Sequence, residues 1–367
     1  MSRTLQRIPA LDGVRGVAVL LVFASHARVP GFSLGGAGVD AFFVLSGYLI
    51  TSILIGEIAR TGTVSLPRFY LRRIRRLTPA LLALTLLYAL LAPFVWPERS
   101  AAEHAGLSAL GFLYLMDYAR AFFVGHSPLV HTWSLAVEEH FYLVWPFVLI
   151  AMSRWVPVRH WLKALAAAYL AATLWRCLSV DIYGWEATYF RFDARLSALI
   201  LGSLLAVLFK LEAPPRQRQA WAFALIGGAC AIAALAIWTY DGRETTGGWA
   251  TLGIAIAEAL SLAVILTVVE RHGAGTSSLL TRALSGAALV YVGRISYGLY
   301  LYHHPLTYWL YGHHWSVVVL IGLPLALSLA ALSYHLIEQP VLNGRNPFRL
   351  AAPRPERLRP GPLRSEG

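Results

Sequence analysis

Charged residues are scarce in this sequence. Only 14% of its 367 residues are Asp, Glu, Lys or Arg, whereas 57% are hydrophobic, and the mean hydropathy is +0.58. The core of a water-soluble domain cannot hide so much apolar surface, which excludes a soluble globular protein and indicates a polytopic membrane protein. Cysteine is nearly absent. Cys177 and Cys230 each lie within an apolar run, so the sequence supports neither a disulfide framework nor a cysteine metal site.

Acidic residues are few as well. The chain has 19 of them against 31 basic residues, which gives a formal net charge of +12. Nucleic-acid-binding proteins also carry such a charge, but here the arginines occur in short segments between apolar runs. That placement is typical of the cytoplasmic loops of a membrane protein, so we predict a chain surrounded by a lipid bilayer and without a nucleic-acid partner.

Ten apolar segments are candidates to cross a bilayer. They lie near residues 12–29, 37–56, 78–96, 134–152, 162–180, 194–210, 220–239, 249–269, 286–311 and 316–337. We therefore predict an all-α polytopic membrane protein with about ten transmembrane helices and no soluble globular domain. Its integral membrane domain would cover residues 1–340, and the Pro- and Arg-rich residues 341–367 would form a basic, disordered cytoplasmic tail.

Basic residues are concentrated in alternate loops. If the N-terminus is cytoplasmic, the basic loops at residues 68–76, 154–163, 210–218 and 271–282 and the C-terminal tail all fall on the same side as it. The positive-inside rule then predicts that both termini are cytoplasmic. One apolar segment, residues 106–123, contains Asp117 and Arg120 and is predicted to be re-entrant or interfacial. If it crossed, every later orientation would be reversed.

The first span, LDGVRGVAVLLVFASHA at residues 11–27, carries two costly ionisable side chains. Arg15 and His26 are eleven residues apart, which on a helix is three turns plus about 20°, so they share one face about 16 Å apart. An imidazole can accept a proton from a hydroxyl, whereas a guanidinium is suited to holding phosphate or carboxylate. Alternatively, Arg15 reaches the cytoplasmic interface and His26 caps the outer end.

The second span begins with GGAGVDAFFVLSGYLIT, residues 35–51. Asp40 lies at its outer end and His26 at the outer end of the first span, and a short loop joins the two. A carboxylate at this place could orient or charge the imidazole, so we predict that Asp40 lies near His26.

A third polar set lies in HTWSLAVEEHFYLVWP, residues 131–146. His131, Ser134 and Glu138 follow spacings of three and four, so the pattern predicts that they share one helix face and that Glu138, rather than Glu139, points into the bundle. Alternatively, Glu138 pairs with a buried arginine such as Arg195 and holds two helices together.

The basic loop RFYLRRIRRLTPALL, residues 68–82, is dense in arginine. Arg73 and Arg76 are three residues apart on a helical turn, which allows their guanidinium groups to grip one polyphosphate. The alternatives are that these arginines only set the topology or bind anionic lipid headgroups.

Together these segments resemble the acyltransferase-3 family of membrane O-acyltransferases, and the resemblance runs from about Ile8 to Pro340. The matching elements are Arg15 followed after ten residues by His26, GVDAFFVLSGYL, Arg73 and Arg76 followed by Pro79, WSLAVEEHFYL, DARLSALILGSLLA, VGRISYGLYLYHHP and SYHLIEQP. Each element alone is modest, and their order and span carry the identification.

The resemblance implies a multi-pass enzyme of the bacterial inner membrane. It would pass an acyl group, by default acetyl, from cytoplasmic acyl-coenzyme A to a hydroxyl of a carbohydrate or glycolipid on the other side of the membrane. Acyl-coenzyme A is a donor substrate in this scheme, and no metal is expected. Chemistry and resemblance together give the expected roles as follows: His26 as general base, aided by Asp40 or Glu138; Arg15, Arg73 and Arg76 on the donor; Ser134, His131, Arg195 and His303 on the acceptor.

Two departures from the family pattern leave parts of this scheme open. His140 stands where relatives often have glutamine, which leaves the acceptor contacts open, and Ser197 stands where an aspartate commonly follows the matched Arg195, which leaves the partner of Arg195 open. A rival hypothesis is a transporter or flippase with an intramembrane path of His, Arg and Glu. A poorer rival is a metal enzyme built on His303, His304, His313 and His314.

Overall fold

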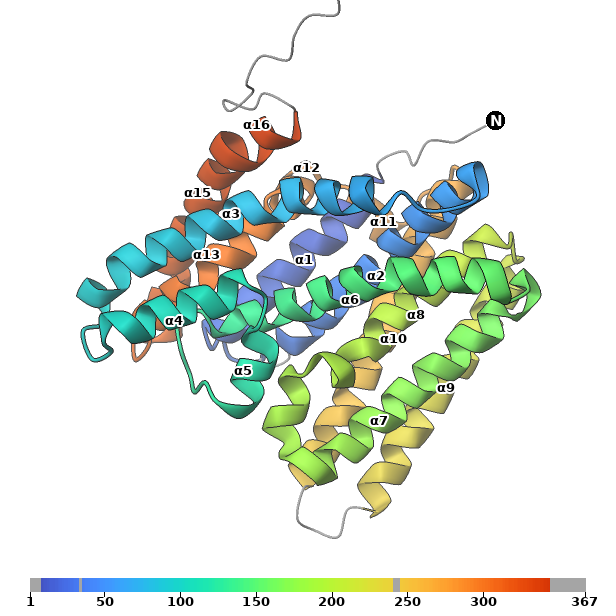
Figure 1. Cartoon of the computed structure of the whole chain (residues 1–367), viewed down its shortest axis with the longest axis horizontal. Helices are drawn as coiled ribbons and strands as arrows, with labels where there is room; N and C mark the ends of the chain where they lie inside the picture. Colours follow the sequence, from blue (N-terminus) through green and yellow to red (C-terminus); the bar gives the residue numbers. More distant parts are fainter. Residues whose placement is uncertain (1–7, 33–34, 240–244, 344–367) are drawn as a thin grey trace, which may run out of the picture.

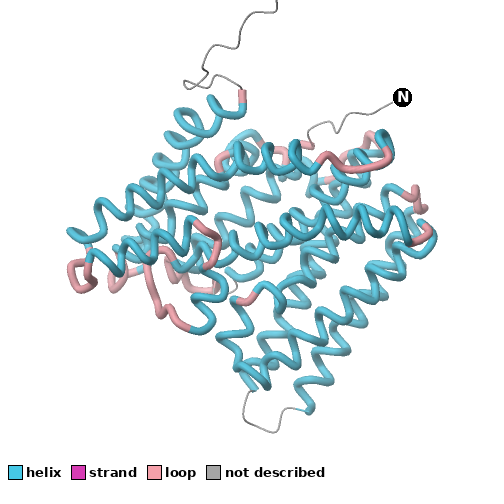
Figure 2. Tube along the Cα trace, in the orientation of Figure 1, coloured by secondary structure: helices cyan, strands magenta, loops and turns pink. Residues whose placement is uncertain are grey.

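The computed structural model describes residues 8–32, 35–239 and 245–343. Over these ranges helices are the only regular secondary structure, joined by mostly short loops (Figures 1 and 2). The all-α prediction is therefore confirmed. The predicted tail after residue 340 begins with a short helix, and residues 344–367 lie outside the described residues.

Eight long helices make up most of the bundle (Figure 1). They are α1 (Pro9–His26), α2 (Gly35–Thr61), α3 (Leu66–Val95), α6 (Trp133–Trp155), α7 (Trp161–Phe190), α8 (Phe192–Lys210), α9 (Pro215–Thr239) and α10 (Thr245–Gly273). The shorter helices are α4 (Ala101–Phe112), α5 (Met116–Phe122), α11 (Leu279–Leu284), α12 (Ala287–Arg294), α13 (Ser296–Trp309), α14 (Trp315–Val317), α15 (Leu323–Ser333) and α16 (Gln339–Leu342). Single 3₁₀ turns η1 (Val130–Thr132) and η2 (Val158–His160) precede α6 and α7, and the π-helical turns η3 (Val318–Gly322) and η4 (Tyr334–Glu338) link α14, α15 and α16.

Nine helical stretches among the described residues are long and apolar enough to cross a membrane. They correspond to nine of the ten predicted spans. The tenth, a single helix over residues 286–311, is wrong, because the chain forms α12 and α13 with an interruption at Ile295. A Cβ on Gly293 would lie 1.7 Å from the carbonyl oxygen of Asp12, so α12 packs directly on the backbone of α1. Because α12 packs so closely on α1, it does not continue into α13 as one helix.

The segment at residues 106–123 also divides into two helices. Ser100 and Glu103 form a capping box at the start of α4, and Tyr114, with φ of 56°, lies in the break before α5. Neither helix approaches the ~20 residues that a transmembrane helix requires. The structure therefore agrees with the prediction of a re-entrant or interfacial piece.

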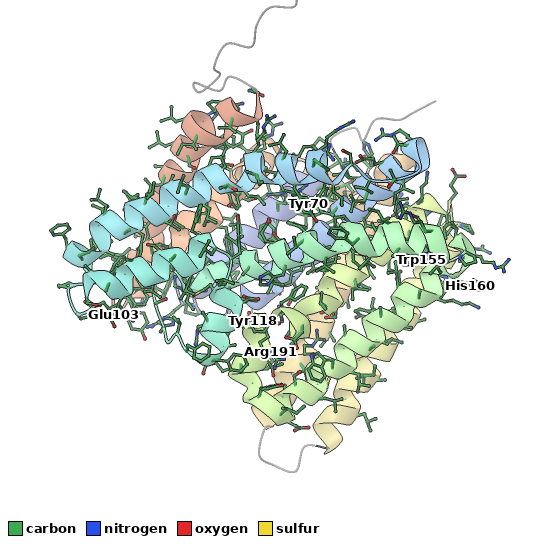
Figure 3. All side chains as sticks on the ribbon, viewed as in Figure 1. Tyr70, Glu103, Tyr118, Trp155, His160 and Arg191 are labelled. Carbon is green, nitrogen blue, oxygen red and sulfur yellow. The ribbon has the colours of Figure 1, made fainter. Side chains whose placement is uncertain are left out.

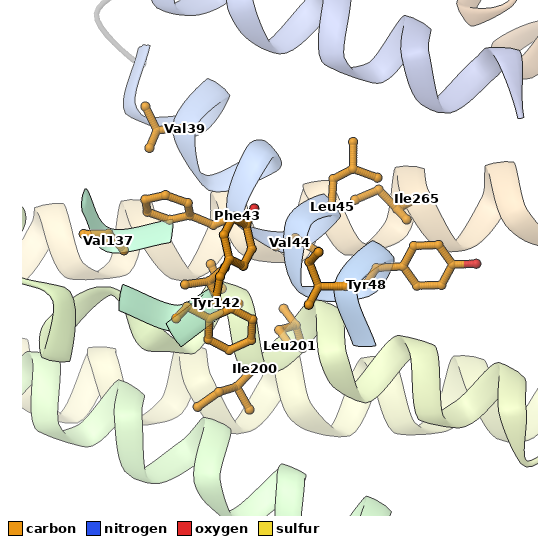
Figure 4. Close-up of a cluster of buried hydrophobic side chains, with 14 of the residues drawn as sticks. Val39, Phe43, Val44, Leu45, Tyr48, Val137, Tyr142, Ile200, Leu201 and Ile265 are labelled. Carbon is orange, nitrogen blue, oxygen red and sulfur yellow. The ribbon is translucent and has the colours of Figure 1, made fainter. Parts of the chain in front are cut away.

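Helix α2 is the centre of the packing. Figure 4 shows Phe43 and Val44 of α2 gathered with Tyr142 of α6 and Leu201 of α8 in one buried apolar cluster. Gly47 brings the backbones of α2 and α8 together, because a Cβ at this position would lie 2.0 Å from the carbonyl oxygen of Leu199. Small residues at helix crossings are the usual means of close packing in membranes.

We expect Gly47→Ala to destabilise the protein by at least about 1–3 kcal/mol, because its methyl group would meet backbone that cannot move aside. Gly56→Ala is the matched control on the same helix, since a Cβ there meets no atom within 4 Å. It should leave stability unchanged or raise it by up to about 1 kcal/mol. Thermal unfolding in detergent measures both, and equal effects would contradict the close packing of α2 on α8.

Candidate active site

A cavity of about 460 Å³ lies between α1, α2, α3, α6, α12 and α13 and the C-terminal helices. Five of the predicted site residues line it: Arg15, Arg73, Arg76, Ser134 and Glu138. Its wall also includes residues from the first turn of α1 and from the C-terminal end of the described chain, such as Asp12 and Leu342. The cavity therefore reaches the end of the bundle where the described chain both begins and finishes.

Three predicted arginines meet in this cavity although α1 and α3 are distant in sequence. Arg15 donates from Nε to the hydroxyl oxygen of Ser296 at 3.2 Å. The guanidinium of Arg73 lies 5.2 Å from the centre of the Tyr142 ring. Three guanidinium groups lining one cavity, with spare donors, form a site suited to a ligand with several phosphate oxygens.

Glu138 is the acidic member of the cavity. It lies beside Ser46 and Tyr142, whose hydroxyl groups are hydrogen bonded to each other, and within electrostatic range of Arg15 and Arg73. Glu139 does not line the cavity. This placement is what the helix-face spacing predicts, and it provides a carboxylate next to the three arginines.

A second group of predicted residues forms a cluster of imidazole rings at the far end of α1. His26 Nδ1 lies 2.9 Å from His303 Nε2, and the His26 ring is 4.8 Å from that of His304. His131 stacks on His304 at 4.9 Å. His26 is exposed, whereas the other three are buried. We name these four residues the histidine cluster.

The hydrogen bonds within this cluster determine which nitrogen of His26 is free. His303 Nδ1 lies 2.6 Å from the carbonyl oxygen of Tyr300, and because a carbonyl only accepts, Nδ1 carries the proton. In neutral His303 the other nitrogen, Nε2, is then an acceptor, so His26 donates to it from Nδ1. His26 is thereby left with a lone pair on Nε2, the form that a general base requires.

His131 is not on the same α-helix as Ser134 and Glu138, so the prediction of one helix face applies only to Ser134 and Glu138. It lies in the 3₁₀ turn η1, before α6 begins, and its Nε2 donates to the carbonyl oxygen of Leu301 at 3.1 Å. Ser134 and Glu138 are on α6 itself. Residues three apart align in a 3₁₀ turn, and the His131 ring accordingly lies 5.6 Å from the ring of Tyr300 on α13, the residue whose hydroxyl Ser134 contacts.

One layer of side chains separates the cavity from the histidine cluster. The hydroxyl groups of Ser134 and Tyr300, both of which line the cavity, are 2.5 Å apart. Tyr300 also donates to the backbone carbonyl of His131 at 2.9 Å, and His303 follows it by one helical turn. The cavity and the histidine cluster are therefore neighbours, linked by the hydrogen bonds of Tyr300.

Asp40 does not contact His26, which corrects the predicted pairing. Its Oδ1 accepts a hydrogen bond from Arg195 Nη2 at 2.5 Å, and both side chains are at most 2% exposed. Asp40 and Gly47 are seven residues apart on α2 and so share the face that packs on α8, where Arg195 lies. The alternative pair of Glu138 with Arg195 is also wrong, and neither Asp40 nor Arg195 lines the cavity.

A second buried ion pair explains the serine found near Arg195. Arg176 Nη1 donates to Glu258 at 2.9 Å and to Ser197 Oγ at 2.6 Å, and Ser197 in turn donates to Glu258 at 2.5 Å. Ser197 thus belongs to a network between α7, α8 and α10, while Arg195 takes its carboxylate from α2.

His140 faces away from the cavity. Its Nδ1 lies 3.1 Å from the buried carboxylate of Asp117 on α5. Nearby, Tyr118 donates to Asp193 at 3.2 Å beside Arg191, and Figure 3 shows Tyr118 and Arg191 close to each other below α6. Burial and the Asp193 carboxylate raise the pKa of Tyr118 to about 12, so it remains a donor. These contacts fasten α5 to the bundle.

Comparison with known proteins agrees with this arrangement. The model of the family described as an acyltransferase domain matches residues 8–335, which is most of the chain. The chain belongs to the acyltransferase-3 family. No solved structure matches it significantly.

Relatives in this acyltransferase-3 family come from Staphylococcus aureus. The O-acetyltransferase OatA of strain NCTC 8325 and that of strain COL are each 32% identical over 360 residues, covering 91% of this chain and 57% of their own. A further protein of strain COL, named an O-acetyltransferase provisionally, is 30% identical over 365 residues, covering 92% of this chain and 58% of its own. This chain thus spans somewhat more than half the length of these relatives.

Sequence reasoning missed several members of this acyltransferase-3 site. His304 was considered only as a metal ligand, and Tyr300 was not considered. His126, in the loop before η1, has its ring 6.2 Å from that of His304. The histidine pair before Pro305 was a signal for His304, whereas His126 lies in a loop whose sequence gives no periodic pattern.

We expect Asp40→Ala to lower the stability of this protein by about 3–5 kcal/mol, because it leaves the Arg195 guanidinium buried without a carboxylate. Replacing both partners, as in Asp40→Leu with Arg195→Met, should cost less, since no charge then remains unpaired. Thermal unfolding in detergent compares the variants. A single variant as stable as the unmodified protein would contradict the importance of the pair.

Proposed function

We propose that this protein is a membrane O-acetyltransferase. It would transfer an acetyl group from cytoplasmic acetyl-coenzyme A to a hydroxyl of a carbohydrate or glycolipid on the other side of a bacterial inner membrane. The observation that carries the proposal is a cavity whose lining includes Arg15, Arg73, Arg76 and Glu138, one layer of side chains away from an exposed histidine with a free nitrogen. The printed names of the Staphylococcus aureus relatives support the acetyl group.

The placement of the chain ends supports a cytoplasmic donor site. Nine crossings would leave the two termini on opposite sides of the membrane, and an additional crossing by α12 and α13 together puts them on the same side. Ile8 and Leu342 both line the cavity, and Figure 1 shows α16 and the start of α1 along the upper side of the molecule. The basic segment around Arg73 and Arg76 lies at this end, which the positive-inside rule assigns to the cytoplasm.

The donor would enter with its phosphate groups among Arg15, Arg73 and Arg76. Each guanidinium offers a planar fork of donors that matches phosphate oxygens, and the low dielectric around the cavity strengthens the attraction. The pantetheine arm would extend along the cavity toward Ser134 and Tyr300, and the thioester would arrive near the histidine cluster.

The transfer itself needs one base and balances without a cofactor. His26 Nε2 would take the proton of the acceptor hydroxyl while its oxygen attacks the thioester carbonyl carbon. The carbon–sulfur bond then breaks, and the leaving thiolate receives the proton from His26. His303, rather than Asp40, would hold the imidazole in its working tautomer through the 2.9 Å hydrogen bond.

We expect His26→Ala to lower acyl transfer by about 10²–10⁴-fold while acetyl-coenzyme A binding is retained, because the base is lost and the arginines remain. Proteoliposomes with donor inside and candidate acceptors outside, followed by free thiol release, measure the transfer. His313→Ala, at an exposed histidine outside the cluster, is the control and should stay active. Full activity of His26→Ala would refute the role of this histidine. Unmodified protein that releases no thiol with any acceptor, but moves a substrate with a pH-dependent flux, would indicate the transporter instead.

Glu138→Gln should impair transfer at least tenfold, because the cavity loses a carboxylate that lies beside both Arg15 and Arg73. Glu139→Gln removes the same charge one residue along the helix, outside the cavity lining, and should be mild. Thiol release measures both variants, after thermal unfolding has shown that they are folded. Equal losses in the two would contradict the assignment of Glu138 to the active face.

A further inference from the structure

Three arginines surround the outer edge of the histidine cluster. Arg28 follows α1, Arg99 precedes α4 and Arg120 lies on α5, so they come from three separate segments of the chain. In the proposed topology this is the outer side of the membrane, where the positive-inside rule predicts few basic residues. A concentration of arginines here therefore calls for a reason other than topology.

All three arginines converge on the loop that contains His126. The Arg28 guanidinium lies 3.8 Å from the centre of the Tyr311 ring, and that ring is 6.3 Å from the His126 ring. Arg99 Nη2 donates to the carbonyl oxygen of His126 at 2.9 Å. Arg120 Nη1 donates to the carbonyl oxygen of Val124 at 3.2 Å. The three charges thus border one small region next to His304 and His26.

The positive charge of this region is only partly neutralised. Arg120 pairs with Glu186, whose side chain is 68% exposed. Among residues 8–32, 35–239 and 245–343, no carboxylate forms a hydrogen bond or ion pair with Arg28 or Arg99. Arg99 Nε and Arg120 Nε are buried and have no hydrogen-bond partner in that part of the chain. Unused guanidinium donors beside a reactive histidine are a means of holding an anion.

The histidine at the centre of the region experiences all three charges. Partial burial, followed by Arg120, Arg28 and Arg99, lowers the pKa of His126, and Glu186 opposes the shift. His126 is therefore neutral at physiological pH and adds no charge of its own, so the arginines determine the sign of the local potential.

We propose that the acceptor is an anionic carbohydrate, whose carboxylate or phosphate group is held by Arg28, Arg99 and Arg120 while a neighbouring hydroxyl reaches His26. This inference rests on the proposed function and adds the charge class of the acceptor to it. Guanidinium groups bind a carboxylate and a phosphate alike through paired hydrogen bonds, so the same three arginines could hold either group. A neutral sugar would leave the donors unused.

Binding to the purified full chain, without acyl donor, tests the proposal directly. The probes are oligosaccharides of matched length that contain only glucose, alternate glucose with glucuronate, or carry glucose 6-phosphate units. We expect the charged probes to bind at least tenfold more tightly than the neutral one at low salt, and the difference to shrink as salt is raised. The better of the two charged probes identifies carboxylate or phosphate. Equal binding of all three would overturn the proposal.

Variants separate this site from general electrostatics. Replacing Arg28, Arg99 and Arg120 together by Gln should lower the affinity of the protein for the charged probe to its affinity for the neutral probe. The control is the same change at three exposed arginines at the other end of the bundle, Arg154, Arg159 and Arg216. It removes an equal charge and should preserve the difference in affinity between the charged and the neutral probes. Arg28→Gln alone is the variant least able to disturb folding, because Arg28 is exposed, and it should weaken the charged probe several-fold. Unchanged affinity in the folded triple variant would overturn the proposal.

Thiol release distinguishes a failure of this inference from a failure of the proposed function. Transfer to neutral acceptors with the same catalytic efficiency as to charged ones would refute the anionic acceptor and leave the acetyltransferase intact. Tight binding of charged probes with no thiol release from any of them would support the arginine site and count against acyl transfer.

Discussion

The arrangement of this protein depends on the cost of a charged side chain inside a membrane. Such a group is tolerated only when another part of the protein supplies its counter-charge or hydrogen bonds. Asp40 and Arg195 meet this condition across α2 and α8, and Arg176 and Glu258 meet it across α7 and α10. Each pair joins helices that are separate in sequence, and Gly47 allows the first pair to close by bringing two backbones together. The ion pairs and the close helix packing are therefore one structural feature.

The cost of burying charge also explains which ionisable side chains are available to the candidate active site. Once Asp40 and Arg195 are paired with each other, they are not available to the site, and the charged side chains that line the cavity are four arginines (Arg15, Arg73, Arg76 and Arg294) and three carboxylates (Asp12, Glu138 and Glu338). At the far end of α1, neutral imidazoles take the place of charges, because carbonyl groups and neighbouring rings satisfy them. One end of the site is thus suited to an anionic donor and the other to proton transfer at neutral nitrogen.

The cavity and the histidine cluster are also built from different kinds of elements. The cavity is lined by long helices whose apolar faces are buried together, whereas the histidine cluster combines the end of α1, the turn η1 and the short helix α13. Short elements joined by breaks, such as the one at Ile295, can place side chains at angles that a continuous helix does not allow. His303 and His304, adjacent on α13, contact His26 of α1 and His131 of η1 respectively.

Composition and spacing by themselves determined that this is an all-helical membrane protein and that Ser134 and Glu138 share one face of α6, because these follow from apolar length and from the 3.6-residue period of a helix. The tertiary structure brought Arg15, Arg73, Arg76 and Glu138 to one cavity. The identity of the partner of each buried charge was decided only by the tertiary structure. Asp40 is close to His26 along the chain but faces α8, and His131 lies in a 3₁₀ turn before α6 and contacts α13. Which charges pair depends on which helix faces meet. The spacing of residues in the sequence shows which side chains lie together on one helix, but it does not show which side chains of another helix they contact.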